Sequence, residues 1–356
     1  MNTATASIDE GRLQTLLGTM VTELGAAAAG ALIVVGDRLG LYKALAGRGP
    51  ATSVQLARWT GTAERYVREW LAAQAASGYV EYDPHTQRFS MTAEQAAVFA
   101  DDESPAQMTG GYYSIASVYK GVETLVERFR DGQGIRWGDH DGCLFCGVAK
   151  FFRPSYKAGL VQEWLPALDG VVHKLERSAR VADVGCGYGS STIIMAQAFP
   201  RAEFVGYDFH PHSIEHARAE AARAGVANVR FEVAAAKDYP ADGYDLVTFF
   251  DCLHDMGDPV GAARHVRETL ADEGTWMLVE PMAGDELSAN LNPVGRAYYA
   301  FSTSVCTPTS LSQEVGAALG AQAGERRLRE IIEGGGFSRV RRAAQTPFNL
   351  ILEARA

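Results

Sequence analysis

The sequence predicts an α/β fold: a mainly parallel sheet that follows a mainly helical N-terminal domain. From Val171 onward, short apolar runs alternate with amphipathic helical stretches, which is the order of a parallel sheet with right-handed crossovers. Before residue 100, helical patterns precede two short strands. The 356 residues are 47% hydrophobic and 21% charged, which is typical of a compact globular protein with two or three domains.

The first hundred residues predict the element order helix, helix, helix, hairpin. Thr52 or Ser53 can cap a short helix after the first one. The next helix carries its apolar residues on one face: Val67, Trp70, Leu71 and Ala75. Tyr79 to Tyr82 and Arg88 to Met91 then predict two strands joined by a turn. This order is that of a winged helix.

The charge of this domain argues against DNA as its partner. Residues 1–100 contain eight Lys or Arg and nine Asp or Glu, and the whole chain has a formal net charge of −10. In the helix that would enter a groove, Glu64 and Glu69 offset Arg65 and Arg68. Phosphate contacts supply most of the affinity for nucleic acid. We therefore expect no nucleic-acid partner, and a structural or dimerising role for the domain.

The sequence predicts a cytoplasmic protein without a membrane partner. The longest apolar stretch, Gly25 to Gly36, is shorter than the ~20 residues of a membrane span and predicts a buried helix. Asp9 and Glu10 stand where a secretory leader would have a basic start. Five cysteines, an odd number, fit reduced thiols better than a disulfide framework.

Residues 101–170 predict a connecting helical layer, rich in aromatic side chains, that could cover a pocket. Most aromatic residues in such a layer nevertheless belong to the core. Cys143 and Cys146 form a lone CxxC pair. A structural zinc site needs four ligands, usually from two such pairs, and the sequence has no second pair. We therefore predict no metal site.

Seven apolar runs predict the strands of the sheet: 181–184, 203–207, 229–233, 244–250, 275–279, 339–343 and 349–353. Helical patterns follow the first five runs, at 190–198, 212–224, a short piece near Lys237, 260–270 and 311–334. The last two strands are close enough along the chain to form a terminal hairpin.

The motif with most chemical information follows the first of these strands. Asp183 and Val184 lead into Gly185-Cys186-Gly187-Tyr188-Gly189, and a helix begins immediately afterwards. Glycines let a ligand lie against the backbone at the carboxyl edge of a parallel sheet. The GxGxG spacing and the acidic residue ahead of it differ from a dinucleotide site, where a carboxylate would repel a pyrophosphate. A carboxylate here favours a ligand with a cationic end.

A second acidic residue, Asp208, ends the next strand, where it can accept hydrogen bonds from both hydroxyls of a ribose. Together Asp183, the glycines and Asp208 describe a nucleoside with a ribose, no phosphate requirement and a positively charged amino-acid tail. S-adenosylmethionine has these parts.

The glycine motif and the strand that ends at Asp208 resemble those of class I S-adenosylmethionine-dependent methyltransferases. The N-terminal segment resembles the winged-helix dimerisation domain of small-molecule O-methyltransferases, on the motifs Gly40-Leu41-Tyr42-Lys43-Ala44-Leu45, Glu69-Trp70-Leu71 and Gly78-Tyr79-Val80. The resemblance implies a Rossmann-like sheet of seven strands with an antiparallel seventh strand, and a homodimer formed through the N-terminal domains. It divides the chain into a winged-helix domain (1–100), a substrate-covering region (101–170) and a methyltransferase domain (171–356).

The adenine end of the predicted site departs from that family. An acidic residue often contacts adenine at the end of its third strand, whereas residues 233–239 here read Val-Ala-Ala-Ala-Lys-Asp-Tyr. The Ala236 backbone could supply contacts, and Asp238 or Tyr239 could lie near the ring. The predicted cofactor-binding residues are Asp183, Gly185, Cys186, Gly187, Gly189, Asp208, Phe209, Ala236 and Asp251.

The fourth strand ends in Asp251-Cys252-Leu253-His254-Asp255, which resembles the signature in which the family's histidine is the general base. Met256-Gly257 replaces the family's Trp-Ser. An imidazole, whose ordinary pKa is ~6.5, can take a proton from a hydroxyl near neutral pH. Glu280 matches the family's glutamate that orients this histidine. The alternative for His254 is a helix cap or a core hydrogen bond, and the alternative for Glu280 is a structural pairing with a backbone amide or an Arg.

The sequence therefore predicts an enzyme that transfers a methyl group from S-adenosylmethionine to an oxygen, a hydroxyl or carboxyl, of a small apolar or aromatic metabolite. The predicted acceptor-pocket residues are Tyr112, Phe151, Tyr298 and Tyr299. Two alternatives are a winged-helix transcriptional regulator with a ligand-sensing domain, and an S-adenosylmethionine-binding enzyme with non-methylating chemistry.

Overall fold

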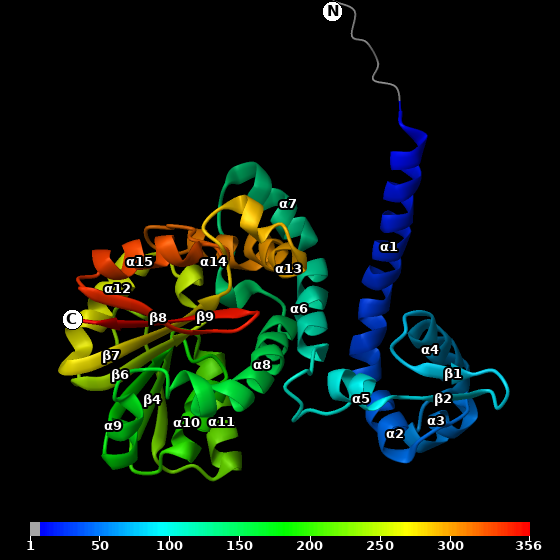
Figure 1. The fold of residues 1–356 in the computed structure, drawn as a ribbon, viewed down its shortest axis with the longest axis horizontal. Helices are drawn as coiled ribbons and strands as arrows, with labels where there is room; N and C mark the ends of the chain where they lie inside the picture. Colours follow the sequence, from blue (N-terminus) through cyan, green and yellow to red (C-terminus); the bar gives the residue numbers. More distant parts are fainter. Residues whose placement is uncertain (1–7) are drawn as a thin grey trace, which may run out of the picture. The chain divides into compact units, whose positions relative to one another are not determined.

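The computed structural model describes residues 8–356, which form two compact units (Figure 1). The first unit ends at Ala116, and the second comprises Ser117–Ala356. This boundary therefore lies after residue 100, the predicted end of the winged-helix domain, and before residue 170, the predicted end of the covering region. The division of the chain into three parts stays a prediction.

The first unit contains the predicted winged helix. Its elements are α1 (Glu10–Arg38), α2 (Leu41–Arg48), α3 (Ser53–Thr60), α4 (Glu64–Ala76), β1 (Glu81–Asp83), β2 (Arg88–Ser90) and α5 (Ala93–Phe99). Thr52 caps α3 through a capping box with Gln55. The strands β1 and β2 pair antiparallel, and Trp70 and Leu71 of α4 are buried in the core of the unit as the helical spacing predicts.

Helix α1 differs from the buried helix that the sequence predicts. It has 29 residues, and only Ala29, Gly30, Ile33 and Gly36 are buried. The preceding turns extend the helix and expose apolar side chains, among them Leu17, Val21 and Leu24. By length and composition α1 is the one described helix that could cross a membrane, with 17% of its apolar window buried. A single helix of this kind is weak evidence for a membrane span, because helices of soluble proteins pass the same test.

The second unit is built on a seven-stranded sheet in the order β5-β4-β3-β6-β7-β9-β8. The strands are β3 (Arg180–Val184), β4 (Glu203–Asp208), β5 (Val229–Val233), β6 (Tyr244–Phe250), β7 (Leu270–Pro281), β8 (Arg339–Gln345) and β9 (Asn349–Arg355). The first five pair in parallel, while β9 is antiparallel to both β7 and β8. All seven predicted strands, the terminal hairpin and the antiparallel last strand are confirmed.

Helices cover both faces of this sheet. Strand residues alternate between two buried clusters, as the two-residue period of a strand requires. One cluster joins the sheet to α12 (Pro259–Thr269) and α15 (Gly324–Gly334). The other joins it to α9 (Val171–Arg177), α10 (Ser190–Ala198) and the π-helix η2 (Tyr156–Trp164). Helix α11 (Pro211–Ala224) packs next to β4 and β5.

Further helical segments lie between the winged helix and the sheet. They are α6 (Thr109–Lys120), α7 (Val122–Asp131), η1 (Trp137–Asp139) and α8 (Cys143–Ser155). After β7 follow η4 (Leu287–Asn290), α13 (Pro293–Phe301), η5 (Ser302–Cys306) and α14 (Thr307–Leu311).

Two predicted helices are wrong. The residues near Lys237 form a turn, and the helix predicted over 311–334 is interrupted between α14 and α15. The interruption contains Val315 at φ +72° and Ala318 at φ +49°, together with glycines at positive φ. A run of left-handed residues is incompatible with a right-handed helix.

Candidate active site

The residues singled out in the sequence meet at one edge of the sheet. The parallel strands β4, β3, β6 and β7 are neighbours, so their carboxyl ends lie side by side. The glycine loop follows β3, Asp208 ends β4, residues 251–255 follow β6, and Glu280 lies near the end of β7. Open α/β sheets bind their ligands at this edge.

The glycine loop requires all three of its glycines. Gly185, Gly187 and Gly189 have φ values of +73°, +53° and +78°, which L side chains rarely adopt. A Cβ on Gly185 would lie 2.7 Å from Cys252 Sγ, and one on Gly189 would lie 2.7 Å from Phe231 Cζ. At Gly187 no atom lies within 4 Å of that position. The loop therefore packs tightly against the rest of the protein at Gly185 and Gly189, and it leaves open space beside Gly187.

Asp183 is buried beneath this loop and held by three hydroxyls. Its Oδ2 accepts from Ser191 Oγ at 2.7 Å and Thr192 Oγ1 at 2.6 Å, and its Oδ1 accepts from Thr248 Oγ1 at 3.0 Å. Burial raises the pKa of Asp183 to about 6, and the hydroxyls only partly oppose this. The carboxylate thus ties β3 to α10 and β6. Contact with a cationic ligand tail stays a prediction.

Asp208 faces the loop from the end of β4. Its Oδ2 accepts the amide N–H of Gly187 at 2.9 Å, and its Oδ1 accepts that of His210 at 2.8 Å. Burial raises the pKa of Asp208 to about 6. Each carboxylate oxygen has further lone-pair capacity, so the group can also accept from two hydroxyls of a ligand.

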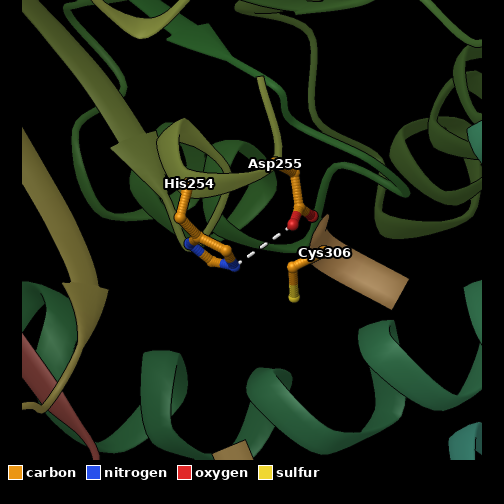
Figure 2. A group of neighbouring side chains, drawn as sticks. All are labelled: His254, Asp255 and Cys306. Carbon is orange, nitrogen blue, oxygen red and sulfur yellow. Dashed lines mark ion pairs between the residues drawn. The ribbon is translucent and has the colours of Figure 1, made fainter. Parts of the chain in front are cut away.

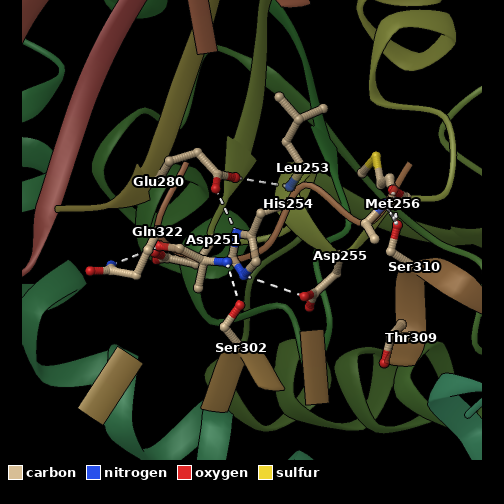
Figure 3. Close-up of polar contacts among 12 residues, drawn as sticks. Asp251, Leu253, His254, Asp255, Met256, Glu280, Ser302, Thr309, Ser310 and Gln322 are labelled. Atoms are coloured by element: carbon tan, nitrogen blue, oxygen red, sulfur yellow. Dashed lines mark hydrogen bonds and ion pairs between the residues drawn. The ribbon is translucent and has the colours of Figure 1, made fainter. Parts of the chain in front are cut away.

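His254 and Glu280 form a buried ion pair (Figure 3). The distance from His254 Nδ1 to Glu280 Oε2 is 2.5 Å, and Glu280 Oε1 accepts the amide N–H of Leu253 at 2.9 Å. Burial alone would lower the pKa of His254, but the carboxylates of Glu280 and Asp255 outweigh it and raise that pKa well above its ordinary value. The imidazole therefore has a high proton affinity, with one nitrogen fixed by Glu280.

The other nitrogen of His254, Nε2, faces the side chains of Asp255 and Cys306 (Figure 2). The sequence did not predict this group of three residues. His254 Nε2 lies 3.3 Å from Asp255 Oδ1, and the buried Cys306 thiol interacts with both side chains. Asp255 Oδ1 is buried but accepts no hydrogen bond. Cys306 comes from η5, far from His254 along the chain, and no local sequence pattern connects them.

Asp251 occupies a strained position at the end of β6. Its φ of +50° is unusual for a residue other than glycine. Its carboxylate accepts from Tyr156 Oη at 3.2 Å and Asn349 Nδ2 at 2.7 Å. Burial and then the nearby Glu280 raise the pKa of Asp251 to about 8. The sequence predicted a cofactor contact for Asp251, and this stays a prediction beside its contacts within the protein.

The remaining predicted cofactor residues lie in different surroundings. Cys186 is buried in the loop, Phe209 is 49% exposed beside Asp208, and Ala236 packs at the margin of the core. The suggestion that Tyr239 lies near an adenine ring stays a prediction. Tyr239 is buried among core residues, and its hydroxyl pairs with Thr269 Oγ1 at 2.9 Å.

Three of the four predicted pocket residues belong to the second unit. Phe151 packs edge to face against Phe152. Tyr298 is buried and donates to the Phe348 carbonyl at 2.9 Å, while Tyr299 is half-buried. Tyr112 belongs to the first unit, where it packs on Gly30 and the winged-helix core. A common role for these four residues stays a prediction.

The fold and site define the class of protein. A sheet in this strand order, a glycine loop after its first strand and an acidic residue at the end of the second are the features of the class I methyltransferase fold. Residues 175–335 match a methyltransferase domain, and residues 27–100 match an Rv2258c-like winged helix-turn-helix domain. The chain therefore contains a methyltransferase domain that follows a winged helix-turn-helix domain, and it has the class I methyltransferase fold.

Solved structures with the same fold cover nearly the whole chain. Human N-acetylserotonin methyltransferase, in complex with S-adenosylmethionine, has a TM-score of 0.70 at 14% identity and covers 99% of both chains. An O-methyltransferase family protein from Burkholderia thailandensis has a TM-score of 0.68 at 16% identity, with the same coverage. Mitomycin 7-O-methyltransferase has a TM-score of 0.67 at 19% identity and covers 98% of this chain and 100% of that chain.

Curated relatives match a shorter stretch. An uncharacterized methyltransferase of Bacillus subtilis is 30% identical over 109 residues, which are 30% of this chain and 42% of that protein. Trans-aconitate 2-methyltransferase of Streptomyces avermitilis is 39% identical over 71 residues, which are 19% of this chain and 26% of that protein. The chain thus matches less than half the length of these relatives.

Proposed function

We propose that this protein transfers the methyl group of S-adenosylmethionine to an oxygen of a small organic acceptor. The observation that carries the proposal is the buried His254–Glu280 pair at the same sheet edge as the glycine loop and Asp208. One end of this edge has the groups to hold a nucleoside, and the other has a base.

The residues present fit this cofactor. The open space beside Gly187 admits a ligand against the backbone, and Asp208 has acceptor capacity for two ribose hydroxyls. When bound, S-adenosylmethionine supplies a methyl group on a positively charged sulfur. Asp183, whose pKa is about 6, is mostly ionised near neutral pH and favours that charge at the edge, although hydroxyls already contact it.

His254 acts as the proton acceptor in its neutral form, with Nδ1–H directed at Glu280, and the raised pKa means that this form becomes more populated as pH rises. The acceptor's O–H bond would break as its proton passed to Nε2, and the acceptor oxygen would take the methyl group that the cofactor supplies, which would leave S-adenosylhomocysteine as the co-product. Glu280 stabilises the imidazolium that forms, because its carboxylate lies 2.5 Å from Nδ1. An acceptor carboxylate needs no base, and for such a substrate His254 would only position the oxygen.

Aromatic side chains of the second unit favour an apolar or aromatic acceptor. Phe151, Tyr298 and Tyr299, which all belong to the second unit, are the proposed ring surface. Orientation of the two reactants in such a pocket can account for several kcal/mol of the barrier.

The test begins with binding and ends with product. Calorimetry should detect S-adenosylmethionine and S-adenosylhomocysteine but neither NAD nor ATP. The protein is then incubated with a metabolite extract and methyl-labelled cofactor, and mass spectrometry should find a methylated product in proportion to S-adenosylhomocysteine. Binding without any S-adenosylhomocysteine would favour a non-methylating reaction. Failure to bind the cofactor would overturn the proposal.

We further propose a cytoplasmic homodimer formed through the first unit. Leu13, Leu17, Met20 and Leu24 recur at helical spacing on α1, and most of this stripe is exposed. A second copy of α1 would cover the stripe. Light scattering should report a dimer that Leu17→Ser/Leu24→Ser converts to monomer, with Thr15→Ser/Thr19→Ser as the matched control. Sedimentation of the unchanged protein with lipid vesicles would instead indicate membrane attachment.

A further inference from the structure

We propose that His254 Nε2, the Asp255 carboxylate and Cys306 Sγ form a binding site for a borderline-soft divalent ion, with Zn²⁺ as the expected occupant. Ligand atoms of these three residues all lie within 4.8 Å of one another, and no other group of three such residues was found among residues 8–356 (Figure 2). The set joins nitrogen, oxygen and sulfur ligands, a combination suited to Zn²⁺ and Co²⁺ rather than to Mg²⁺ or Ca²⁺.

The geometry fits a tetrahedral ion. Two ligand atoms about 2.0–2.1 Å from a tetrahedral Zn²⁺ are roughly 3.3 Å apart. The distance from His254 Nε2 to Asp255 Oδ1 is 3.3 Å, although the two atoms do not make a hydrogen bond. A small movement of the Cys306 side chain would bring its sulfur into the third position. The fourth position would remain for a water molecule or an acceptor oxygen, as in open zinc sites.

The surrounding residues hold the ligands in place. Histidines that bind metals usually donate their other N–H to a carboxylate, which fixes the tautomer. Glu280 lies 2.5 Å from His254 Nδ1 and thereby directs the lone pair of Nε2 toward Asp255 and Cys306. The segment with Cys306 is tied to the same loop, because Ser310 Oγ donates to the Met256 carbonyl at 2.7 Å (Figure 3).

The charges also favour a cation. Two carboxylates, Asp255 and Glu280, flank a single imidazole in a nearly buried cluster. Asp255 Oδ1 is buried and has an ion-pair contact with His254 Nε2 but no hydrogen bond, and a buried polar atom of this kind is costly. A divalent ion would bind it directly. Ligation replaces the S–H bond of Cys306 with a sulfur–metal bond and releases one proton to solvent.

The consequence for catalysis rests on the proposed function. An ion on His254 Nε2 occupies the lone pair that would accept the proton of the acceptor hydroxyl. Zn²⁺ should therefore inhibit methyl transfer reversibly, and a chelator should restore the activity. The site would then couple the enzyme to the concentration of free zinc.

The experiment uses Co²⁺ as a spectroscopic probe for Zn²⁺. The parent protein is Cys143→Ser/Cys146→Ser, which removes the competing CxxC thiols, and the test protein adds Cys306→Ser. Cys186 and Cys252 are present in both. We expect a 1:1 thiolate-to-Co²⁺ charge-transfer band in the parent that Zn²⁺ abolishes. In the test protein the band should be lost and the affinity for Co²⁺ should fall about tenfold or more.

A band that persists after Cys306→Ser, or no 1:1 band in the parent, would overturn the site. Circular dichroism and the unfolding midpoint establish that both proteins are folded, and Asp255→Asn provides a second variant that should weaken Co²⁺ binding while it retains the thiol. Activation by Zn²⁺ would overturn the inhibitory role. The Co²⁺ spectrum requires no methyl acceptor, so its outcome is independent of whether the proposed methyl transfer is found.

Discussion

The two ends of the candidate site hold their buried carboxylates in different ways. At the glycine loop, Asp183 and Asp208 accept hydrogen bonds from hydroxyls and amides, which carry no charge. Beyond β6, Glu280 and Asp255 instead face the imidazole of His254. Neutral donors do not offset burial, so the pKa values of Asp183 and Asp208 are raised to about 6. The ionisable partners in the second cluster keep a proton on or near His254.

This difference indicates a division of labour. The loop end is suited to bind a cofactor. A change in pH there should alter the affinity for the cofactor and the free energy of unfolding. The His254 end is suited to move a proton, and its substitution should appear in turnover. Substitutions at the loop end should therefore change mainly the dissociation constant of the cofactor. Substitutions at the His254 end should change mainly kcat.

The largest effect is expected for His254→Ala. Loss of a general base typically lowers a rate by about 10²–10⁴-fold, so kcat for a hydroxyl acceptor should fall by that factor. The dissociation constant of S-adenosylmethionine should stay within about twofold, measured by calorimetry. A variant with unchanged kcat would remove His254 as the base, and a large loss of cofactor affinity would contradict the separation of the two ends.

The next effect concerns the stability contributed by Asp183. Its folded pKa of about 6 is above the ordinary value of 3.8, so the folded state holds this proton more tightly than the unfolded state. Stability should therefore fall as pH rises from about 4 to about 6, by up to about 3 kcal/mol, and then level off. Asp183→Asn should flatten this part of the curve. Urea unfolding at a series of pH values measures it, with Asp272→Asn as an exposed control.

Asp208 should produce a smaller effect, in cofactor affinity. Below pH 6 its carboxylate becomes protonated and loses acceptor capacity for ribose hydroxyls. The dissociation constant of S-adenosylmethionine should rise as pH falls, by about tenfold per unit at most. In Asp208→Asn the affinity should be weaker at pH 8 and nearly independent of pH between 5 and 7. An unchanged pH dependence in that variant would assign the titration to another group.

The sequence predicts much of the fold because the relevant signals are local. Strand β3 and the loop after it are recognisable from a short apolar run followed by GxGxG, and Thr52 is recognisable as a cap. The interruption before α15 was missed because Val315 and Ala318 take positive φ values that their side chains do not signal. The exposure of α1 was missed because an apolar helix has the same composition whether or not it is covered.

The candidate site was predictable to the extent that its residues end strands. His254 and Glu280 lie at or just past strand ends, the resemblance implied their roles, and the structure brings them together. Cys306 was missed because it arrives from a helical segment after β7, and only the three-dimensional packing places it beside Asp255. The three hydroxyls around Asp183 were missed for the same reason, although Ser191 and Thr192 lie in the helix that directly follows the loop.

The smallest effect is expected for alanine substitutions of the loop glycines, which should differ from one another in stability and in cofactor affinity. Gly187→Ala meets no atom within 4 Å, so its cost is limited to the left-handed backbone at φ +53°, about 1 kcal/mol of unfolding free energy. Gly185→Ala has the same backbone cost and also forces a contact of 2.7 Å with Cys252 Sγ, so it should be less stable in urea than Gly187→Ala. If the space beside Gly187 is where the cofactor lies, Gly187→Ala should nevertheless weaken S-adenosylmethionine binding by more than its loss of stability suggests. Equal losses of affinity in the two variants, in proportion to their stabilities, would place the ligand elsewhere along the loop.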